Sequence, residues 1–412
     1  MHYLCQQMKK LVSWMMLLAL VACSTDDANN APPAGPARRT VVVYMAGENN
    51  LSNYVEDDLW EMKTGRAKAA ANENLVVFVD RQPNKTKPLS EQEKPFIALV
   101  TTDKRLDTLY RYQDDFYSSD PTQMTAVLKK AIELCPATED YGLVLWGHGT
   151  GWLMEQEVSA TRAYGLDNGN CIGNSGKWIN VPTLKNILQK MPHMKFIMCD
   201  CCHMMCLEDL YELRHVTDYM IGSPAEIPGQ GAPYDTILPA MFEKEMFYSS
   251  IIERYHTSVK GELPLSVVKM SEMDNVAQAT AQALQSVKTN LGDGYADMTG
   301  IIHYGYDDNG SEHLDVHNFY YDAGDFMSRY ASAADYQMWN EALSKAVIMK
   351  RTGYKWDTLK KWEKFYTDFK MTEEKFHGVS MFVPQSPSTS NYNQYNDDIK
   401  QMEWFKLLAN DL

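Results

Sequence analysis

Two short segments of this chain carry side chains that could act together as a nucleophile and a base. An apolar run at residues 141–146 is followed by His148 between two glycines, and a second run at 195–199 is followed by Asp200 and Cys202. A histidine can draw the proton from a thiol and leave a thiolate, because a free thiol with a pKa of about 8.5 is mostly protonated at neutral pH. The pair therefore predicts nucleophilic catalysis by Cys202 with His148 as its base.

The elements that carry these residues read as buried strands. Continuous apolar runs are typical of parallel strands, and the carboxyl ends of such strands are where open α/β sheets bind ligands. Neighbouring strands would bring His148 and Cys202 to the same edge. Successive side chains of a strand point to opposite faces, so Cys199 and Cys201 are expected to face the core, away from Asp200 and Cys202.

Simpler roles stay open for each residue. A histidine at a strand end can be purely structural, and Asp200 can cap the helix expected to begin near Cys202. The cluster Cys199–Cys206, with His203, could form a metal-binding module, since thiolates and imidazole satisfy tetrahedral zinc. The spacing disfavours zinc, because structural sites usually pair two separated knuckles and strand alternation points neighbouring thiols apart.

Further segments resemble the clostripain family of cysteine peptidases, relatives of caspases, gingipains and legumain. The resemblance covers most of the chain beyond residue 40. Its segments are 41–51, similar to the family's first strand and its MAGDNNL turn; 142–152, similar to the HG(S/T)GW box; 200–202, in the place of D-A-C; and 211–214, 223–231 and 378–384, similar to a downstream helix, a substrate-side loop and a late strand.

The resemblance implies an endopeptidase that hydrolyses peptide bonds with Cys202 as nucleophile and His148 as base. The backbone N–H groups of Gly149 and Cys202 would form the oxyanion hole. Asp200 would lie near the floor of the S1 pocket and select Arg or Lys at P1. Glu226, in the loop after the expected strand 219–223, would add a second negative wall.

Two positions depart from the family pattern, and two questions stay open. Cys201 replaces the usual alanine, and His203 follows the nucleophile where an apolar residue is common, so the P1 preference is less fixed than the reaction type. No cofactor is expected, and the sequence leaves a calcium requirement undetermined.

A second function is also compatible with the sequence. The chain could be a catalytically weak, clostripain-like surface lipoprotein that binds peptides or glycoconjugates.

The start of the chain predicts export. Lys9 and Lys10 precede an apolar run at 11–22 that is too short to span a bilayer and fits the core of a signal peptide. The run ends directly before Cys23, which resembles the lipidated cysteine of bacterial lipoproteins. Residues 1–22 are therefore expected to be a lipoprotein signal peptide, and 23–39 a flexible tether. The expected location is the bacterial cell envelope, with the protein lipid-anchored at the outer membrane and exposed at the cell surface.

The amino-acid composition and net charge limit the classes of molecule that the protein could bind. The 412 residues carry a formal net charge of −15, which disfavours nucleic acid, and 45% of them are hydrophobic, enough for a sizeable core. Protein or peptide substrates are expected, with membrane contact through the lipid anchor alone.

The alternation of strands and helices predicts an α/β fold, a caspase-like αβα sandwich with a mostly parallel central sheet and a C-terminal, mainly helical extension. The peptidase core is expected at 40–250 and the extension, packed on the core, at 251–412. The expected strands are 41–46, 75–80, 96–102, 106–111, 141–146, 195–200, 219–223 and 378–384, and the expected helices are 51–71, 121–134, 181–190, 206–216, 274–291, 320–331, 334–349 and 399–409.

We predict self-cleavage between the two reactive residues, because the resemblance implies maturation by internal cuts in this region. Residues 153–176 are polar and small, as in exposed loops that proteases cut. Arg162, flanked by small residues, is favoured over Lys177, which precedes a tryptophan. Mass spectrometry should find the cut in the active protein and not in Cys202→Ala. The loop would be an ordinary surface connection, with no autoprocessing, if both proteins or neither were cut.

Overall fold

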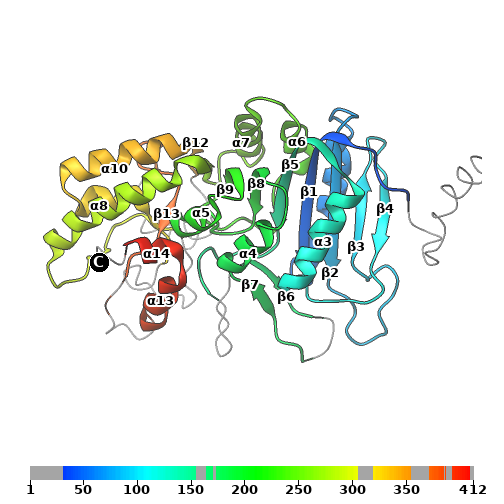
Figure 1. The fold of residues 1–412 in the computed structure, drawn as a ribbon, viewed down its shortest axis with the longest axis horizontal. Coiled ribbons are helices and arrows are strands. Elements are labelled where there is room, and N and C mark those ends of the chain that lie inside the picture. The colour runs from blue at the N-terminus through cyan, green and yellow to red at the C-terminus, as the bar shows by residue number, and fades with distance from the viewer. Residues whose placement is uncertain are drawn as a thin grey trace, which may run out of the picture.

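The fold is built on one large sheet with helices on both of its faces (Figure 1). The computed structural model describes residues 31–154, 164–169, 173–304, 319–353, 371–384, 386 and 392–408. Within these residues nine strands form the sheet, in the order β12-β10-β9-β8-β5-β1-β2-β3-β4. The five central strands, β9 to β2, are parallel, and antiparallel strands flank them on both sides.

The elements have the following bounds. The strands are β1 (Ala37–Gly47), β2 (Asn74–Arg81), β3 (Phe96–Val100), β4 (Leu106–Arg111), β5 (Ala137–Trp146), β6 (Tyr164–Asp167), β7 (Lys177–Ile179), β8 (Met194–Asp200), β9 (Thr217–Gly222), β10 (Leu265–Lys269), β11 (Tyr321–Asp322), β12 (Val347–Arg351) and β13 (Ser380–Met381). The α-helices are α2 (Val55–Arg66), α3 (Pro121–Leu134), α4 (Val181–Leu188), α5 (Leu207–Leu213), α6 (Tyr234–Met241), α7 (Phe247–Ser258), α8 (Met273–Leu291), α9 (Ala323–Tyr330), α10 (Ala333–Ala346), α13 (Tyr392–Asp398) and α14 (Glu403–Leu408), with short 3₁₀ turns at Ser52–Tyr54, Met270–Glu272 and Ile399–Gln401.

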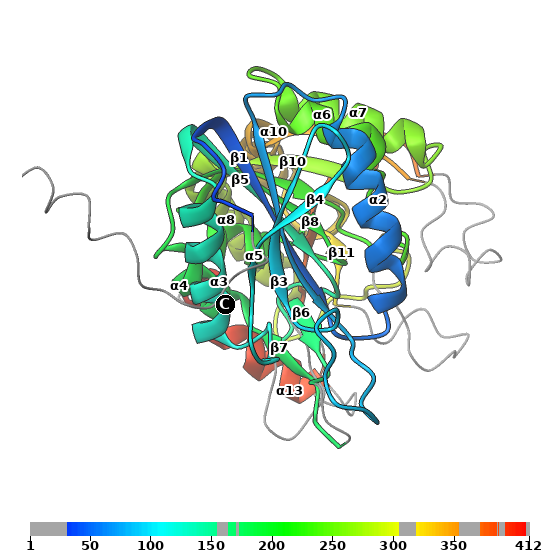
Figure 2. The same cartoon turned by 90° about the vertical axis from the view of Figure 1, so that its right-hand side faces the viewer.

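The central strands are apolar because both of their faces are covered. In β1, Val42 and Tyr44 face one hydrophobic cluster, whereas Val41 and Val43 face another. Helices α2, α6 and α7 pack on the second face, and α3, α4 and α5 pack on the first (Figure 2). This double burial explains why the strands read as unbroken hydrophobic runs, and it confirms the predicted α/β architecture with its mostly parallel sheet.

Local signals set several boundaries where the sequence predicts them. Helix α3 begins after Asp120, whose carboxylate accepts hydrogen bonds from the backbone N–H groups of Thr122 (2.9 Å) and Gln123 (3.0 Å). Pro121 occupies the first helical position, where its missing N–H costs nothing. The strand expected at 195–200 is β8, and the strands expected at 96–102 and 106–111 are β3 and β4, which pair in antiparallel fashion.

Other boundaries were wrong. The helix expected at 51–71 starts with a 3₁₀ turn and ends at Arg66, and the helix expected at 334–349 ends at Ala346. From Val347 the chain becomes β12, because it pairs with β10, a strand that the sequence pattern did not reveal. The strand expected at 378–384 shortens to β13, which pairs with β11.

The part of the chain after residue 250 joins the same sheet. Strands β10 and β12 add its last two strands, and α10 packs on both of them and on α8 (Figure 1). Helix α9 packs in turn on α8 and α10. The boundary between 250 and 251 stays a prediction. Cys23 and the signal peptide lie outside the described residues, and within those residues no helix is both long and apolar enough to cross a bilayer.

Candidate active site

His148 and Cys202 lie at the carboxyl ends of two neighbouring parallel strands, β5 and β8. The register pairs Trp146 of β5 with Asp200 of β8, the last residue of each strand. The backbone N–H of Gly147 then donates a hydrogen bond to the carbonyl oxygen of Asp200, at 3.3 Å. The two sequence motifs therefore leave the sheet at the same level of one edge.

A glycine allows the two chain segments to touch. A Cβ atom on Gly149 would lie 2.8 Å from the carbonyl oxygen of Cys202 and 3.2 Å from its nitrogen, closer than ordinary side chains come. Any other residue at position 149 would push the backbone of Cys202 away. The two residues expected to form the oxyanion hole are thus in direct backbone contact.

The cysteines divide as strand alternation predicts. Cys199 and Cys201 are 1% exposed and belong to the hydrophobic core, whereas Cys202 is half-buried. The Cys202 sulfur accepts a hydrogen bond from the backbone N–H of Ile227, at 3.3 Å. Such a donor favours negative charge on the sulfur, which is the form that reacts.

The side-chain amide of Asn50, a residue that the sequence motifs did not point to, forms a hydrogen bond with His148. The Nε2 atom of His148 lies 2.6 Å from Oδ1 of Asn50, in the turn after β1. An amide oxygen can only accept, so the Nε2 atom carries the hydrogen and the lone pair of the neutral ring is on Nδ1. The backbone N–H of Gly165 also donates to the carbonyl oxygen of His148, at 2.8 Å.

Asp200 is a buried carboxylate, and only one of its two oxygens accepts hydrogen bonds from the described residues. Its Oδ2 accepts hydrogen bonds from the hydroxyl of Tyr234 (2.7 Å) and the backbone N–H of Ala232 (3.2 Å). Its Oδ1 is buried and receives no hydrogen bond within the described residues. Burial raises the pKa of Asp200 to about 6, although the two hydrogen bonds oppose that rise.

A second buried acid, Asp58 of α2, faces the same place. The indole N–H of Trp146 donates to its Oδ2 at 2.5 Å, and a Cβ on Gly231 would lie 2.9 Å from an oxygen of Asp200 and 3.4 Å from Asp58 Oδ2. Burial, and then the charge of Asp200, raise the pKa of Asp58 to about 8. At neutral pH Asp58 therefore keeps its proton, and where Asp200 titrates Asp58 is already neutral.

The sequence contains a pattern from which Asp58 could have been recognised as a candidate site residue. Val55, Leu59 and Met62 form the buried stripe of α2, and Asp58 occupies a position on this stripe. A carboxylate on the apolar face of a helix is rare unless something pairs with it.

Glu226 lies near His203. Its Oε1 lies 3.9 Å from Nε2 of His203, whose ring stacks on Tyr320 with 4.1 Å between centroids. Burial lowers the pKa of His203 to about 4, so this histidine is neutral at pH 7 and the contact is not a salt bridge. Nδ1 of His203 lies 3.1 Å from the carbonyl oxygen of Pro224, which fixes the start of the loop at 223–231.

The remaining site predictions fall at the rim or elsewhere. Arg162 lies outside the described residues, and Lys177 is exposed at the start of β7, with its ammonium 4.1 Å from the ring centroid of Tyr117. Within the described residues the Cys199–Cys206 cluster does not bring three potential metal ligands within 4.8 Å of one another. The zinc alternative is therefore not favoured.

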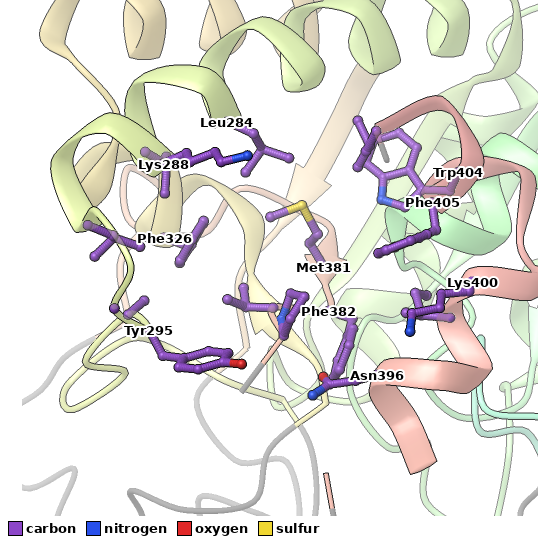
Figure 3. A pocket seen from close by; sticks show the side chains of 18 of the residues that line it. Leu284, Lys288, Tyr295, Phe326, Met381, Phe382, Asn396, Lys400, Trp404 and Phe405 are labelled. Atoms are coloured by element: carbon purple, nitrogen blue, oxygen red, sulfur yellow. The ribbon is translucent and has the colours of Figure 1, made fainter. Parts of the chain in front are cut away.

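A pocket of about 670 Å³ lies away from both motifs (Figure 3). It is enclosed by the end of α8, the segment after it, and the C-terminal segments around Met381 and Trp404. Leu284, Phe382 and Phe405 give it a largely apolar wall. The pocket holds neither reactive residue, so it is not the candidate active site.

Comparison with known proteins identifies the family. The sequence profile of the clostripain family, Peptidase_C11, matches residues 43–411. The chain belongs to this family of cysteine peptidases. Clostripain of Hathewaya histolytica is 26% identical in an alignment of 222 positions that covers 48% of this chain and 41% of clostripain. The chain thus matches less than half the length of that curated relative.

Two solved structures of this family match almost the whole fold. A secreted C11 cysteine protease from Bacteroides thetaiotaomicron, in complex with an irreversible peptide inhibitor, is 29% identical with a TM-score of 0.72 and covers 92% of this chain and 99% of its own. An inactive zymogen of a C11 protease from Parabacteroides distasonis is 27% identical with a TM-score of 0.71 and covers 91% and 99%. The caspase-like character of the predicted sandwich is thereby confirmed for this clostripain-family chain.

Proposed function

We propose that this clostripain-family chain is an endopeptidase in which Cys202 is the nucleophile and His148 is the base. The observation that carries the proposal is the contact between the ends of β5 and β8, where Gly149 lies against the backbone of Cys202. A half-buried thiol and a histidine whose tautomer is set by Asn50, both at this edge of the sheet, support acyl transfer to sulfur.

The reaction follows from these groups. Nδ1 of His148 takes the thiol proton, and the thiolate of Cys202 attacks the scissile carbonyl carbon. The N–H groups of Gly149 and Cys202 donate to the resulting oxyanion. His148 returns the proton to the leaving amine as the C–N bond breaks, which leaves a thioester. Water, deprotonated by the same ring, hydrolyses the thioester and regenerates the thiol.

Asp200 supports a preference for Arg or Lys at P1. Its Oδ1 is buried and receives no hydrogen bond from the part of the chain that the structure describes, and leaving a carboxylate without a counter-charge in a protein interior is costly. A guanidinium or ammonium group would supply both the charge and the hydrogen bonds. Glu226 contributes a second negative group from the loop that contacts Cys202. Asp58, protonated beside Asp200, keeps a single negative charge at the pocket floor.

The proposed place of action is the bacterial cell envelope. Lipid attachment at Cys23 would hold the enzyme at the outer membrane. The expected tether at 23–39 is too long at its end, because Ala37 to Arg39 already pair in β1, so only the residues before Ala37 would separate the anchor from the catalytic fold. The Bacteroides thetaiotaomicron relative is described as secreted, which agrees with a site of action outside the cytoplasm. Protein or peptide substrates are the proposed partners.

We predict that Cys202→Ala and His148→Ala each lower peptide hydrolysis by several orders of magnitude, because each removes a member of the reacting pair. Cys201→Ala is the matched control: its side chain faces the core, and alanine keeps its Cβ. A thiol-directed peptide probe should label the wild type and Cys201→Ala but not Cys202→Ala. Activity in Cys202→Ala, or an unlabelled wild type, would favour the peptide-binding alternative.

Asn50→Ala should lower kcat about 10-fold with little change in KM, because the hydrogen bond that fixes the His148 tautomer is lost while the substrate contacts stay. Asn50→Asp, which keeps an acceptor oxygen and adds charge, should shift the acid limb of the kcat profile to higher pH. Asn53→Ala, on the exposed side of the same turn, is the control. Equal losses in Asn50→Ala and Asn53→Ala would mean that the turn acts only through stability.

The P1 preference should depend on pH through Asp200. Since the pKa of Asp200 is raised to about 6, its carboxylate is charged above pH 6 and neutralised as the pH falls through 6. The ratio of kcat/KM for a P1 Arg substrate to that for its uncharged citrulline analogue should therefore fall below pH 6. His148 affects both substrates alike, so it cancels in the ratio.

In Asp200→Asn the same ratio should drop about 100-fold at pH 7.5 and lose its pH dependence, because a buried cation is left unpaired. Asp57→Asn, an exposed change on α2, should leave the ratio unchanged. A wild-type enzyme that prefers apolar or acidic P1 residues would contradict the assignment of Asp200.

A further inference from the structure

Trp178 lies beside the proposed base, yet the proposed reaction gives it no task. It is the middle residue of β7, in the antiparallel pair that β6 and β7 form beyond the carboxyl end of the central strands (Figure 1). Its ring centroid lies 6.1 Å from that of His148, and the two ring planes are inclined by 52°. The sequence motifs did not point to this residue.

Backbone contacts fix the hairpin of β6 and β7 against the histidine. The N–H of Gly165 donates a hydrogen bond to the carbonyl oxygen of His148 at 2.8 Å, and Gly149 forms an antiparallel bridge with Tyr164. The side chain of Tyr164 is fully buried in the core. The fold of the hairpin therefore sets the position of Trp178 relative to the base.

The indole of Trp178 faces outward because its neighbour faces inward. Ile179 is buried and belongs to the same hydrophobic cluster as Tyr164. Successive side chains of a strand point to opposite sides, so Trp178 points away from that cluster, and it is only half-buried. Among the described residues it is a member of neither hydrophobic cluster. A large aromatic group thus lies next to the base without a place in the core.

The floor of the proposed S1 pocket and Trp178 lie on opposite sides of the reacting pair. Tyr234, which donates to Asp200, belongs to the hydrophobic cluster on the α2 face of the sheet, whereas the buried residues of the hairpin belong to the cluster on the other face. In the proposed reaction the ring of His148 donates a proton to the leaving amine. The residue after the scissile bond, P1′, therefore lies on the side of this ring that is away from S1, where Trp178 is.

We propose that Trp178 forms the wall of the S1′ subsite, and that the enzyme prefers a large apolar residue, such as leucine or phenylalanine, directly after the scissile bond. Contact with the indole removes apolar surface from water, and a rigid ring loses little conformational freedom on binding. A glycine at P1′ would leave this surface in water. The inference rests on the proposed peptidase function and adds to it the leaving side of the substrate.

The fate of the thioester measures this subsite separately from S1. An N-blocked ethyl ester of the preferred P1 residue acylates Cys202 and releases ethanol, which has no side chain for S1′. An added amino-acid amide then competes with water: its nitrogen bonds to the acyl carbon, its proton passes to His148, and the C–S bond breaks to restore the thiol. Chromatography gives the ratio of amide product to acid product. His148 acts in both branches, so a change in its position cancels in this ratio.

We expect the ratio with leucinamide to be about 10-fold higher than with glycinamide at equal concentrations of free amine, because an apolar wall discriminates between side chains by roughly this factor. Trp178→Ala should remove most of this advantage, whereas Trp178→Phe, which keeps an aromatic ring, should retain much of it. Trp60→Ala is the matched control and should leave the ratio unchanged, because Trp60 is 63% exposed on α2.

The outcomes distinguish this inference from the function on which it rests. An ester that is not hydrolysed, together with a thiol-directed probe that does not label Cys202, would contradict the peptidase function and the subsite with it. Hydrolysis of the ester with equal ratios for leucinamide and glycinamide, or an advantage that survives in Trp178→Ala, would contradict the S1′ assignment alone. If Trp178→Ala does not fold, Trp178→Gln and the wild-type ratios decide in its place.

Discussion

The parallel pairing of β5 with β8 is the constraint on which the rest of the candidate site depends. Its register ends both strands at one level, with Trp146 beside Asp200. Parallel strands expose their carboxyl ends on one side of a sheet, so residues that follow different strands can meet there. The meeting needs Gly149, because a side chain at this position would occupy the space of the Cys202 backbone. Register and one missing Cβ therefore bring together two segments more than fifty residues apart.

Several buried carboxylates lie at the edge of the sheet that carries His148 and Cys202. Asp58 and Asp200 lie on one side of β1, and the cluster of Glu48, Asp80 and Asp167 lies near its end. Buried carboxylates lower the stability of a fold unless a cation or a proton compensates them. At Asp200 the proposed compensating cation comes from outside the chain, as a basic P1 side chain. Stability and ligand binding are coupled at this edge for that reason.

The loop at 223–231 joins the nucleophile to the acidic pocket. The N–H of Ile227 donates to the sulfur of Cys202, and just beyond the loop the N–H of Ala232 donates to Asp200. His203 holds the start of the loop through Pro224, and it can do so as a neutral donor because burial keeps it uncharged. The histidine that departs from the family pattern thus has a structural explanation in the packing of this loop.

The sequence by itself determined the five parallel strands at the centre of the sheet, the alternation that separates Cys201 from Cys202, and the helix that starts after Asp120, because these features depend on neighbouring residues and on local periodicity. Only the tertiary structure decided which acids share a site. Asp58 meets Asp200, and Glu48 meets Asp167, through contacts between segments that no local pattern relates. The strand β12 is a similar case, since its residues continue a helical pattern and become a strand only because the edge of β10 offers hydrogen-bonding partners. Long-range pairing, rather than propensity, fixes such features.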